Sequence, residues 1–356
     1  MRVLSCWFIG TMAVAFGLVA CGSDDASTSG GDAGDDAAVQ LDSGIDGSVD
    51  ASRDGSIDSG KATDAGSDAC PGNQLCFDGH LYVANFNNGS NGFVGVYDGP
   101  AVDSDASATT TLGADAGIFA PDDVAYDPVS NNVAVVDFEG KVLLFASPLT
   151  ASSVPSVTLK TGQASVAAAF DSSGRLYVSQ FNGMLTMFPP PFSNGNAGNV
   201  TIVVAGFGNL FGAAIDPATQ NLFIDGVAPG GTPGIALFAT PLTGSSVPIA
   251  SFGETGGSYF AGAVVQPSTG KLYASHTQAG VIEVYDPPFA DGGAPASTFN
   301  GGGGASPWHL RFAASGELLI PDHALGILVV NPASPTVARV ALAHGVEDVR
   351  GVTVAP

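Results

Sequence analysis

A short apolar stretch, Leu-Tyr-Val-Ser at Leu176–Ser179, recurs along the chain and decides the fold. Its copies start 43 to 52 residues apart, a period typical of repeat proteins whose units carry several short strands. Turn-forming residues flank each copy, so the pattern predicts a strand and not a helix. The six copies are Leu81–Ala84, Val133–Val136, Leu176–Ser179, Leu222–Asp225, Leu272–Ser275 and Leu318–Pro321.

Each copy sits at the same place in a larger unit. A strand of small residues and a turn precede five of the copies, as in Ala168–Ser172. A third apolar strand follows each copy, and in the first five units it ends on an aromatic residue with proline three residues later, as at Phe145 and Pro148. A weaker fourth strand comes next, as in Ser156–Leu159. Four short strands per unit of this length predict the blades of a β-propeller.

The ends of the chain predict how the ring closes. The first unit lacks its innermost strand, and the C-terminal segment Gly351–Pro356 matches the missing one. We therefore expect the last strand to complete blade one, which hides both free sheet edges. The predicted fold class is all-β, with a six-bladed β-propeller over residues 70–356. The pattern resembles NHL-type and related six-bladed propeller repeats from Cys76 to the end.

Residues 1–20 read as an export signal. Arg2 supplies the positive end, an uncharged apolar run follows, and the run closes on Leu18-Val19-Ala20-Cys21. This stretch resembles the lipobox of bacterial lipoproteins, which implies cleavage before Cys21 and attachment of acyl chains to its sulfur. Two or three such chains hold a protein stably on a membrane. An ordinary signal peptide and a membrane anchor are the alternatives, and all three place the remaining chain outside the cytoplasm. Outer-membrane or cell-surface placement is the expected localisation.

Residues 21–69 predict a disordered tether. Between residues 22 and 69 there are twelve aspartates, two basic residues and no aromatic residue, so the segment cannot bury enough apolar surface to fold. Cys70 and Cys76, which flank the start of the globular part, predict one disulfide in an oxidising compartment. The alternative, half of a metal site, lacks a second pair of ligands. The whole chain carries a formal net charge of −23, which argues against nucleic acid and anionic lipid headgroups as partners.

Polar residues gather at the predicted channel mouth, where the second strands end and the first strands begin. Loops at this end of a propeller usually carry the binding site. Residues expected after second strands are Asn85, Asp137, Gln180, Asp225, His276, Asp322 and His323, and those expected at the starts of first strands are Asp122, Asp123, Tyr259, Trp308, His309, Glu347, Asp348 and Arg350. Asp127, Asp171 and Asp216 recur at the opposite end and are expected to form turns.

Two metal hypotheses follow from this set. His276, His309 and His323, together with Asp322, are the ligand types that zinc prefers. Asp137 and Asp225, with Asp122 and Asn85, offer the oxygen ligands of calcium. An NHL-type lyase family uses histidine-bound zinc, and sugar-lactonase propellers hold calcium, although the full lactonase motif does not map onto this chain. The alternative is that these side chains satisfy loop backbone or face water.

Three functional hypotheses remain. A binding or scaffold module for an envelope protein, peptide or glycan requires nothing beyond the features above and is preferred. A metal-dependent hydrolase or lyase at the mouth is the alternative, and a purely structural spacer is the third. The only other partner that the sequence indicates is the membrane, reached through the lipid on Cys21, and we expect a monomer.

The lipidation hypothesis predicts the behaviour of one cysteine variant. Cys21→Ala removes the only sulfur at the predicted cleavage site, so the protein should lose its acyl chains and leave the membrane fraction. Mass spectrometry and fractionation measure both outcomes. Cys6→Ala, inside the predicted signal peptide, is the matched control and should be lipidated normally. A Cys21→Ala protein that keeps the acyl mass would refute the hypothesis.

Overall fold

The computed structural model describes residues 74–87, 91–253, 259–301, 306–335, 339–342 and 348–356. All of these residues belong to one unit, Thr63–Pro356. The predicted signal peptide, Cys21, the tether and Cys70 lie outside the described ranges, so export, lipidation and the disulfide stay predictions. Within the described ranges, no helix combines the length and apolar character needed to cross a bilayer.

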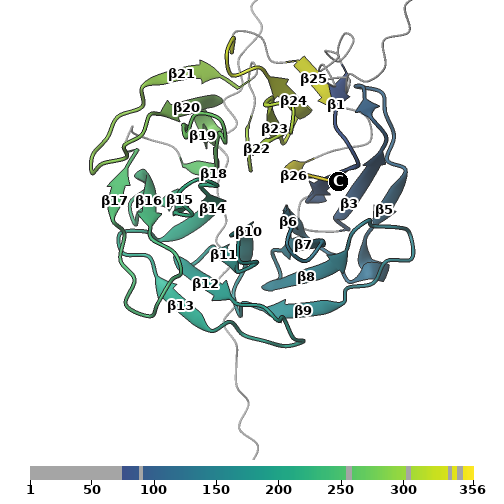
Figure 1. The fold of residues 1–356 in the computed structure, drawn as a ribbon, viewed down its shortest axis with the longest axis horizontal. Helices are drawn as coiled ribbons and strands as arrows, with labels where there is room; N and C mark the ends of the chain where they lie inside the picture. The colour runs from purple at the N-terminus through teal and green to yellow at the C-terminus, as the bar shows by residue number, and fades with distance from the viewer. Residues whose placement is uncertain (1–73, 88–90, 254–258, 302–305, 336–338, 343–347) are drawn as a thin grey trace, which may run out of the picture. The chain divides into compact units, whose positions relative to one another are not determined.

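Six four-stranded antiparallel sheets are arranged in a ring around a central axis, as Figure 1 shows, so the predicted six-bladed β-propeller is confirmed. From the central axis outward, blade 1 contains β26 (Val349–Ala355), β2 (His80–Asn85), β3 (Phe93–Asp98) and β5 (Thr110–Leu112), and blade 2 contains β6 (Pro121–Asp127), β7 (Asn132–Asp137), β8 (Lys141–Ala146) and β9 (Val157–Lys160). Blade 3 contains β10 (Ser165–Phe170), β11 (Leu176–Gln180), β12 (Met184–Phe188) and β13 (Val200–Val203), and blade 4 contains β14 (Asn209–Ile215), β15 (Leu222–Val227), β16 (Pro233–Phe238) and β17 (Ala250–Phe252). Blade 5 contains β18 (Phe260–Val265), β19 (Leu272–His276), β20 (Val281–Tyr285) and β21 (Ser297–Asn300), and blade 6 contains β22 (Arg311–Phe312), β23 (Leu318–Asp322), β24 (Gly326–Val330) and β25 (Arg339–Leu342).

Ring closure follows the prediction. The C-terminal strand β26 pairs with β2, with His80 opposite Ala355 and Val83 opposite Val352. Blade 1 is therefore built from both ends of the globular part. This pairing covers the edge of β2 that would otherwise be unpaired.

The repeated apolar strand is buried on both faces because each blade packs between two others. In blade 1, Leu81 packs with residues of blade 6 such as Leu319, whereas Tyr82 packs with residues of blade 2 such as Phe145. Neighbouring side chains of a strand point to opposite faces of the sheet. A second strand between two blades therefore requires large apolar residues at consecutive positions, which explains the continuous Leu-Tyr-Val pattern.

The aromatic–proline pairs at the ends of the third strands mark a shared turn. In blades 2 to 5 the peptide bond before the proline is cis, at Ser147–Pro148, Pro190–Pro191, Thr240–Pro241 and Pro287–Pro288.

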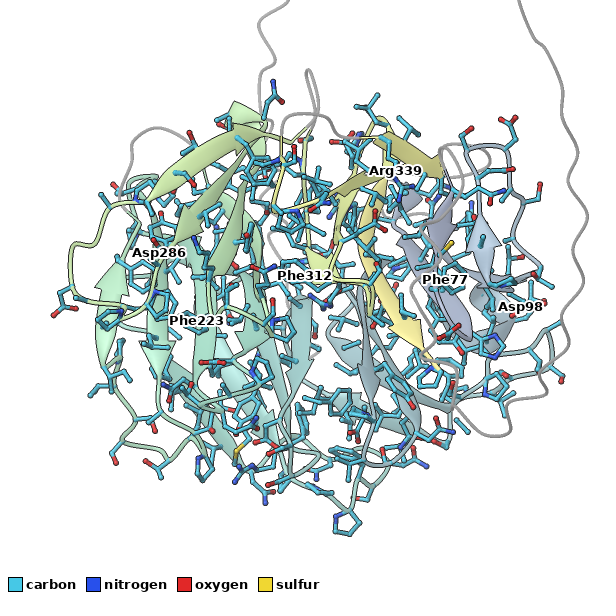
Figure 2. All side chains as sticks on the ribbon, turned by 45° about the horizontal axis from the view of Figure 1, so that its top comes forward. Phe77, Asp98, Phe223, Asp286, Phe312 and Arg339 are labelled. Carbon is cyan, nitrogen blue, oxygen red and sulfur yellow. The ribbon has the colours of Figure 1, made fainter. Side chains whose placement is uncertain are left out.

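One further strand pair attaches the start of the described chain to the ring. Strand β1 (Leu75–Cys76) pairs with β4 (Ala101–Val102), and the adjacent Phe77 is buried. Arg339, labelled with Phe77 in Figure 2, forms an ion pair with Glu317 at 2.7 Å and donates a hydrogen bond to the carbonyl of Gln74. The entry of the chain into blade 1 is thus also tied to blade 6.

Every innermost strand carries one residue more than its partner at the mouth end. In blade 2, Pro121 faces Asp137 and Asp123 faces Val136, so Asp122 is the extra residue of a β-bulge. Blades 1, 3, 4 and 5 have the same register shift. In blade 6, Pro307 faces Asp322 and Arg311 faces Leu319, which again leaves one extra residue. By this count the bulge residues are Arg350, Asp122, Val166, Phe211, Ala261 and Trp308.

Closure by the last strand predicts a strong effect of truncation. Deleting residues 349–356 exposes β2 and removes the buried Val349 and Val352. The lost burial is worth on the order of 5 kcal/mol, comparable with the whole stability of a typical domain. We expect no cooperative thermal transition by circular dichroism. Deleting the exposed Pro356 alone is the control and should leave the transition unchanged. A truncated protein that unfolds at the wild-type midpoint would contradict the closure.

Candidate ligand-binding mouth

The six bulge residues meet at the mouth of the channel, because a bulge re-aims the side chain of its extra residue. Val166, Phe211, Ala261 and Trp308 form one buried apolar cluster. The other two bulge residues form an ion pair, with Arg350 Nη1 2.8 Å from Asp122 Oδ1. Four blades therefore contribute an apolar plug, and blades 1 and 2 contribute a charged pair beside it.

A series of six aromatic rings, one from each blade, includes Phe211 and Trp308 of this plug and continues around the mouth. Consecutive ring centroids lie 4.7 to 6.3 Å apart, the range in which aromatic pairs attract each other. Arg350 closes the series, with its guanidinium carbon 3.5 Å from the ring centroid of Phe86 and 4.5 Å from that of Trp308. We call this set the aromatic belt. Its rings, in order, are Phe86, Phe138, Phe181, Phe211, Tyr259 and Trp308.

Part of the aromatic belt is accessible from outside. Phe181 is 41% exposed, and Phe138 and Tyr259 are half-buried. Phe119, which precedes β6, is 40% exposed and carries the Lys141 ammonium 4.6 Å from its ring centroid. The belt is therefore anchored by its buried members and presents an apolar surface through the others.

Arg350 is held by carboxylates as well as by rings. Its Nε lies 3.2 Å from Asp348 Oδ1, and His323 Nε2 lies 3.4 Å from the same oxygen. Burial raises the pKa of Asp122 to about 6, and the ion pair with Arg350 offsets only part of that rise. The charge of Arg350 is thus balanced inside the mouth, because two acidic groups face it.

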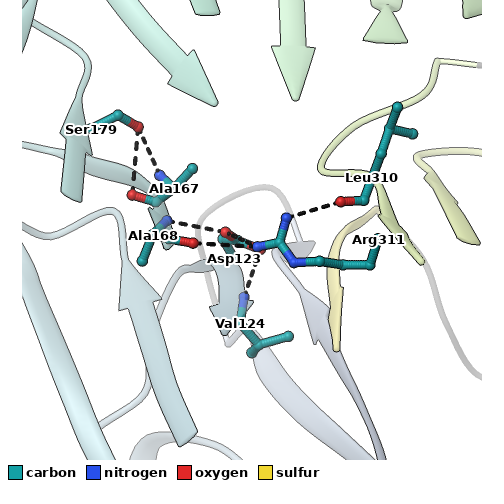
Figure 3. A network of polar contacts seen from close by, with 7 residues as sticks. All are labelled: Asp123, Val124, Ala167, Ala168, Ser179, Leu310 and Arg311. Atoms are coloured by element: carbon teal, nitrogen blue, oxygen red, sulfur yellow. Dashed lines mark hydrogen bonds and ion pairs between the residues drawn. The ribbon is translucent and has the colours of Figure 1, made fainter. Parts of the chain in front are cut away.

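A second arginine spans the channel below the mouth, as Figure 3 shows. Arg311 of blade 6 places Nη2 2.8 Å from Asp123 Oδ2 of blade 2. The same oxygen accepts a hydrogen bond from the amide of Ala168 in blade 3, and Asp123 Oδ1 accepts one from Val124. Burial raises the pKa of Asp123, and Arg311 counteracts that rise. We call this arrangement, which connects three blades, the Arg311–Asp123 clasp.

The structure places the five predicted metal ligands in separate environments. Asp137 accepts hydrogen bonds from the amides of Phe119 and Glu139, both at 2.9 Å. His276 Nδ1 lies 3.4 Å from Glu283 of its own blade. His323 is largely exposed beside Asp348. Asp137 and His323 thus have local partners, whereas His276 Nε2 has no hydrogen-bond partner among the described residues.

His309 is fully buried and sits between two cations. Neither ring nitrogen has a hydrogen-bond partner among the described residues. Burial lowers the pKa of His309 well below its usual value, and Arg311 and Arg350 lower it further. The imidazole is therefore neutral at pH 7.

Asp225 requires a correction of register. The sequence placed it level with Asp137, but Gly226 takes that position and Asp225 lies one residue deeper. Its structural counterparts are Ser179 and Ser275. The predicted alignment was one residue off because blade 4 has a longer second strand than the motif indicates.

The carboxyl of Asp225 is enclosed without a strong partner. Gly212 faces it, and a β-carbon there would lie 1.9 Å from Asp225 Oδ2, so only glycine fits. The amides of Gly212 and Gly262 are near enough to lower its pKa, but neither oxygen has a well-formed hydrogen bond among the described residues. Burial dominates and raises the pKa of Asp225 to about 8.

The described residues contain no group of three or more His, Cys, Asp or Glu placed to share a metal ion. His276, His309, His323, Asp137 and Asp225 are thus not brought together as one site, and metal binding stays a prediction. Glu347 lies outside the described ranges. Asp127 and Asp216 cap turns at the opposite end, accepting hydrogen bonds from Val129 and Ala218, as predicted.

Sequence reasoning named Tyr259 and Trp308 at the mouth but missed the aromatic belt. The signal was present, because phenylalanine follows the second strand directly in blades 1 to 3, at Phe86, Phe138 and Phe181. Phe211 could not be placed at the mouth without knowledge of the bulge.

Comparison with known proteins gives no family. No model of a protein family matches the chain, and no curated protein is detectably similar to it. The class that the fold defines is therefore the six-bladed β-propeller, and function must be argued from the mouth and the channel.

The enclosed Asp225 predicts a pH dependence of stability. Its carboxyl has a pKa of about 8 in the fold, against a reference value of 3.8. The folded state holds a proton that the unfolded chain has released between these values, so this contribution to stability is full below about pH 4 and is lost as pH rises to about 8. The expected loss is on the order of a few kcal/mol.

Urea unfolding at pH 5 and pH 8 measures this loss. Asp225→Ser, which introduces the residue found at this register in blades 3 and 5, should remove most of the Asp225 contribution, as should Asp225→Asn. Asp122, with a pKa of about 6, leaves a smaller dependence in both variants. Equal pH dependence in wild type and both variants would contradict the assignment.

Proposed function

We propose that this chain is a lipid-anchored, extracytoplasmic binding module of the NHL-like type, which recognises a segment of an envelope protein, peptide or glycan over its mouth. The aromatic belt is the observation that carries this proposal. Six rings from six blades surround one point, and three of them remain partly exposed. The acyl chains on Cys21 and the acidic tether would hold this surface outside the cytoplasm.

The rings suit recognition better than they suit catalysis. Exposed aromatic rings bury large apolar area at low entropic cost and stack on sugar rings, aliphatic side chains or cations. The charged groups beside them are engaged with one another, as Arg350 is with Asp122 and Asp348. Within the part of the chain that the structure describes, no specific contact favours the hydrolase or lyase alternative.

Charge narrows the class of ligand. The formal net charge of −23 repels anionic polymers. The rings at the mouth already hold two cations, Lys141 over Phe119 and Arg350 between Phe86 and Trp308. A neutral glycan or a peptide with basic side chains fits these properties.

Binding experiments with defined probes test this proposal. The full-length protein is immobilised and titrated with neutral cello-oligosaccharides and with hexa-arginine, while hexa-glutamate serves as the anionic comparison. We expect binding of a neutral or basic probe and none of hexa-glutamate. The double variant Phe138→Ala/Phe181→Ala should weaken that binding at least tenfold, because it removes the exposed part of the aromatic belt.

Val203→Ala is the matched control, since Val203 is 71% exposed on β13 at the outer edge of blade 3. Its binding should equal that of wild type. If no probe binds, or if the belt variant binds as tightly as the control, the mouth is not the recognition surface.

A further inference from the structure

The channel contains a chamber at the end opposite the mouth, below Asp123 of the Arg311–Asp123 clasp. Innermost strands of all six blades line a cavity of about 190 Å³ there. We call it the lower channel. Its lining includes Ala125, Ala169, Ala214, Val264, Arg311 and Thr353.

These six lining residues occupy one equivalent position, three residues after the bulge in each blade. Five of the six positions hold Ala, Val or Thr, which keep the chamber open. The sixth holds Arg311. A single long cationic side chain thus replaces a small residue at one point of an otherwise small-residue ring.

The guanidinium of Arg311 has more N–H donors than hydrogen-bond partners among the described residues. It donates to the carbonyls of Leu310 and Ala168 and to the carboxylate of Asp123. A guanidinium carries five N–H groups, so two of them have no partner among the described residues. The side chain is 18% exposed and lines the cavity, and its charge is balanced by Asp123. The roof of the lower channel therefore offers hydrogen-bond donors with little net charge.

The open end of the lower channel is apolar. Tyr126, Phe170 and Ile215 line it and are half-buried. The hydroxyl of Tyr126 is held by Asn131 at 2.8 Å, and Phe170 packs edge-on against Phe192. A fitting molecule thus meets apolar side chains such as Phe170 and Ile215 at the open end and the guanidinium of Arg311 at the inner end.

We propose that the lower channel binds a small molecule with an acceptor-oxygen head, a carboxylate or a carboxamide, on a short apolar body. The head accepts hydrogen bonds from Arg311, and the body lies against the alanines. The volume corresponds to about six waters at roughly 30 Å³ each, which suits a molecule of about six non-hydrogen atoms. This site lies at the other end of the channel and does not depend on the proposed function of the mouth.

Butyrate and butyramide, which share size and shape and differ in head-group charge, test this proposal. Each is titrated into the full-length protein, and binding is followed by saturation-transfer NMR and by the shift in thermal midpoint. We expect at least one probe to bind at millimolar concentration or below. Binding of butyrate alone indicates a carboxylate ligand, and binding of butyramide alone or of both indicates that a neutral acceptor suffices.

Two variants locate the binding. Ala169→Phe fills the lower channel, keeps both charged side chains of the clasp and should weaken binding at least tenfold. Ala218→Phe, on an exposed turn outside the cavity, is the matched control and should bind as wild type does. The double variant Arg311→Met/Asp123→Asn removes both charges together, so neither is left buried and unpaired, and it should also lose binding.

The proposal fails if neither probe binds, or if Ala169→Phe binds as tightly as Ala218→Phe. Arg311 would then be a structural clasp over a water-filled chamber. Circular dichroism checks the fold of each variant. If the double variant does not fold, the comparison of Ala169→Phe with Ala218→Phe still decides the question.

Discussion

The site depends on one recurring constraint, the extra residue in each innermost strand. Six bulges at one level of the ring aim six side chains at one point. Without the extra residue the first strands would alternate regularly, and residues such as Trp308 and Arg350 would point into the interfaces between blades. The apolar plug, the pairing of Arg350 with Asp122 and the closure of the aromatic belt all follow from this local irregularity.

Two arginines then join blades that are distant in sequence. Arg350 connects the C-terminal strand to blade 2, and Arg311 connects blade 6 to blades 2 and 3. Each lies in a buried or half-buried setting with several hydrogen bonds. Removing one member of such a pair leaves the other charge buried and unpaired and lowers the free energy of unfolding by about 3–5 kcal/mol. Replacing both members together can leave that free energy nearly unchanged. Their contribution is to fix the ring geometry more than to add net stability.

The architecture could be predicted because packing between blades requires a recognisable apolar pattern in the sequence. A strand between two neighbours is apolar on both faces, and Leu81 and Tyr82 show this directly. The first unit lacks an innermost strand and the C-terminal segment matches it, and this match predicted that the last strand closes the ring. The site was harder, because a bulge shifts register without a residue signature. For this reason Phe211 was not recognised as a mouth residue. Asp225 was placed one position too high because the second strand of blade 4 continues beyond the repeated motif. Histidine content suggested convergence, but only coordinates could show that His276 and His323 face different partners.

The two ends of the channel differ for a reason that can be traced to single positions. At the bulge level, large residues such as Phe211 and Trp308 close the axis and leave an aromatic surface facing outward. Three residues further along the same strands, alanine at Ala125, Ala169 and Ala214 leaves a chamber. The Arg311–Asp123 clasp starts at the alanine level with Arg311 and reaches Asp123, one residue after the bulge in blade 2. A molecule on the mouth and a molecule in the chamber would therefore meet different chemistry, stacking on rings at one end and hydrogen bonding to a charge-balanced guanidinium at the other.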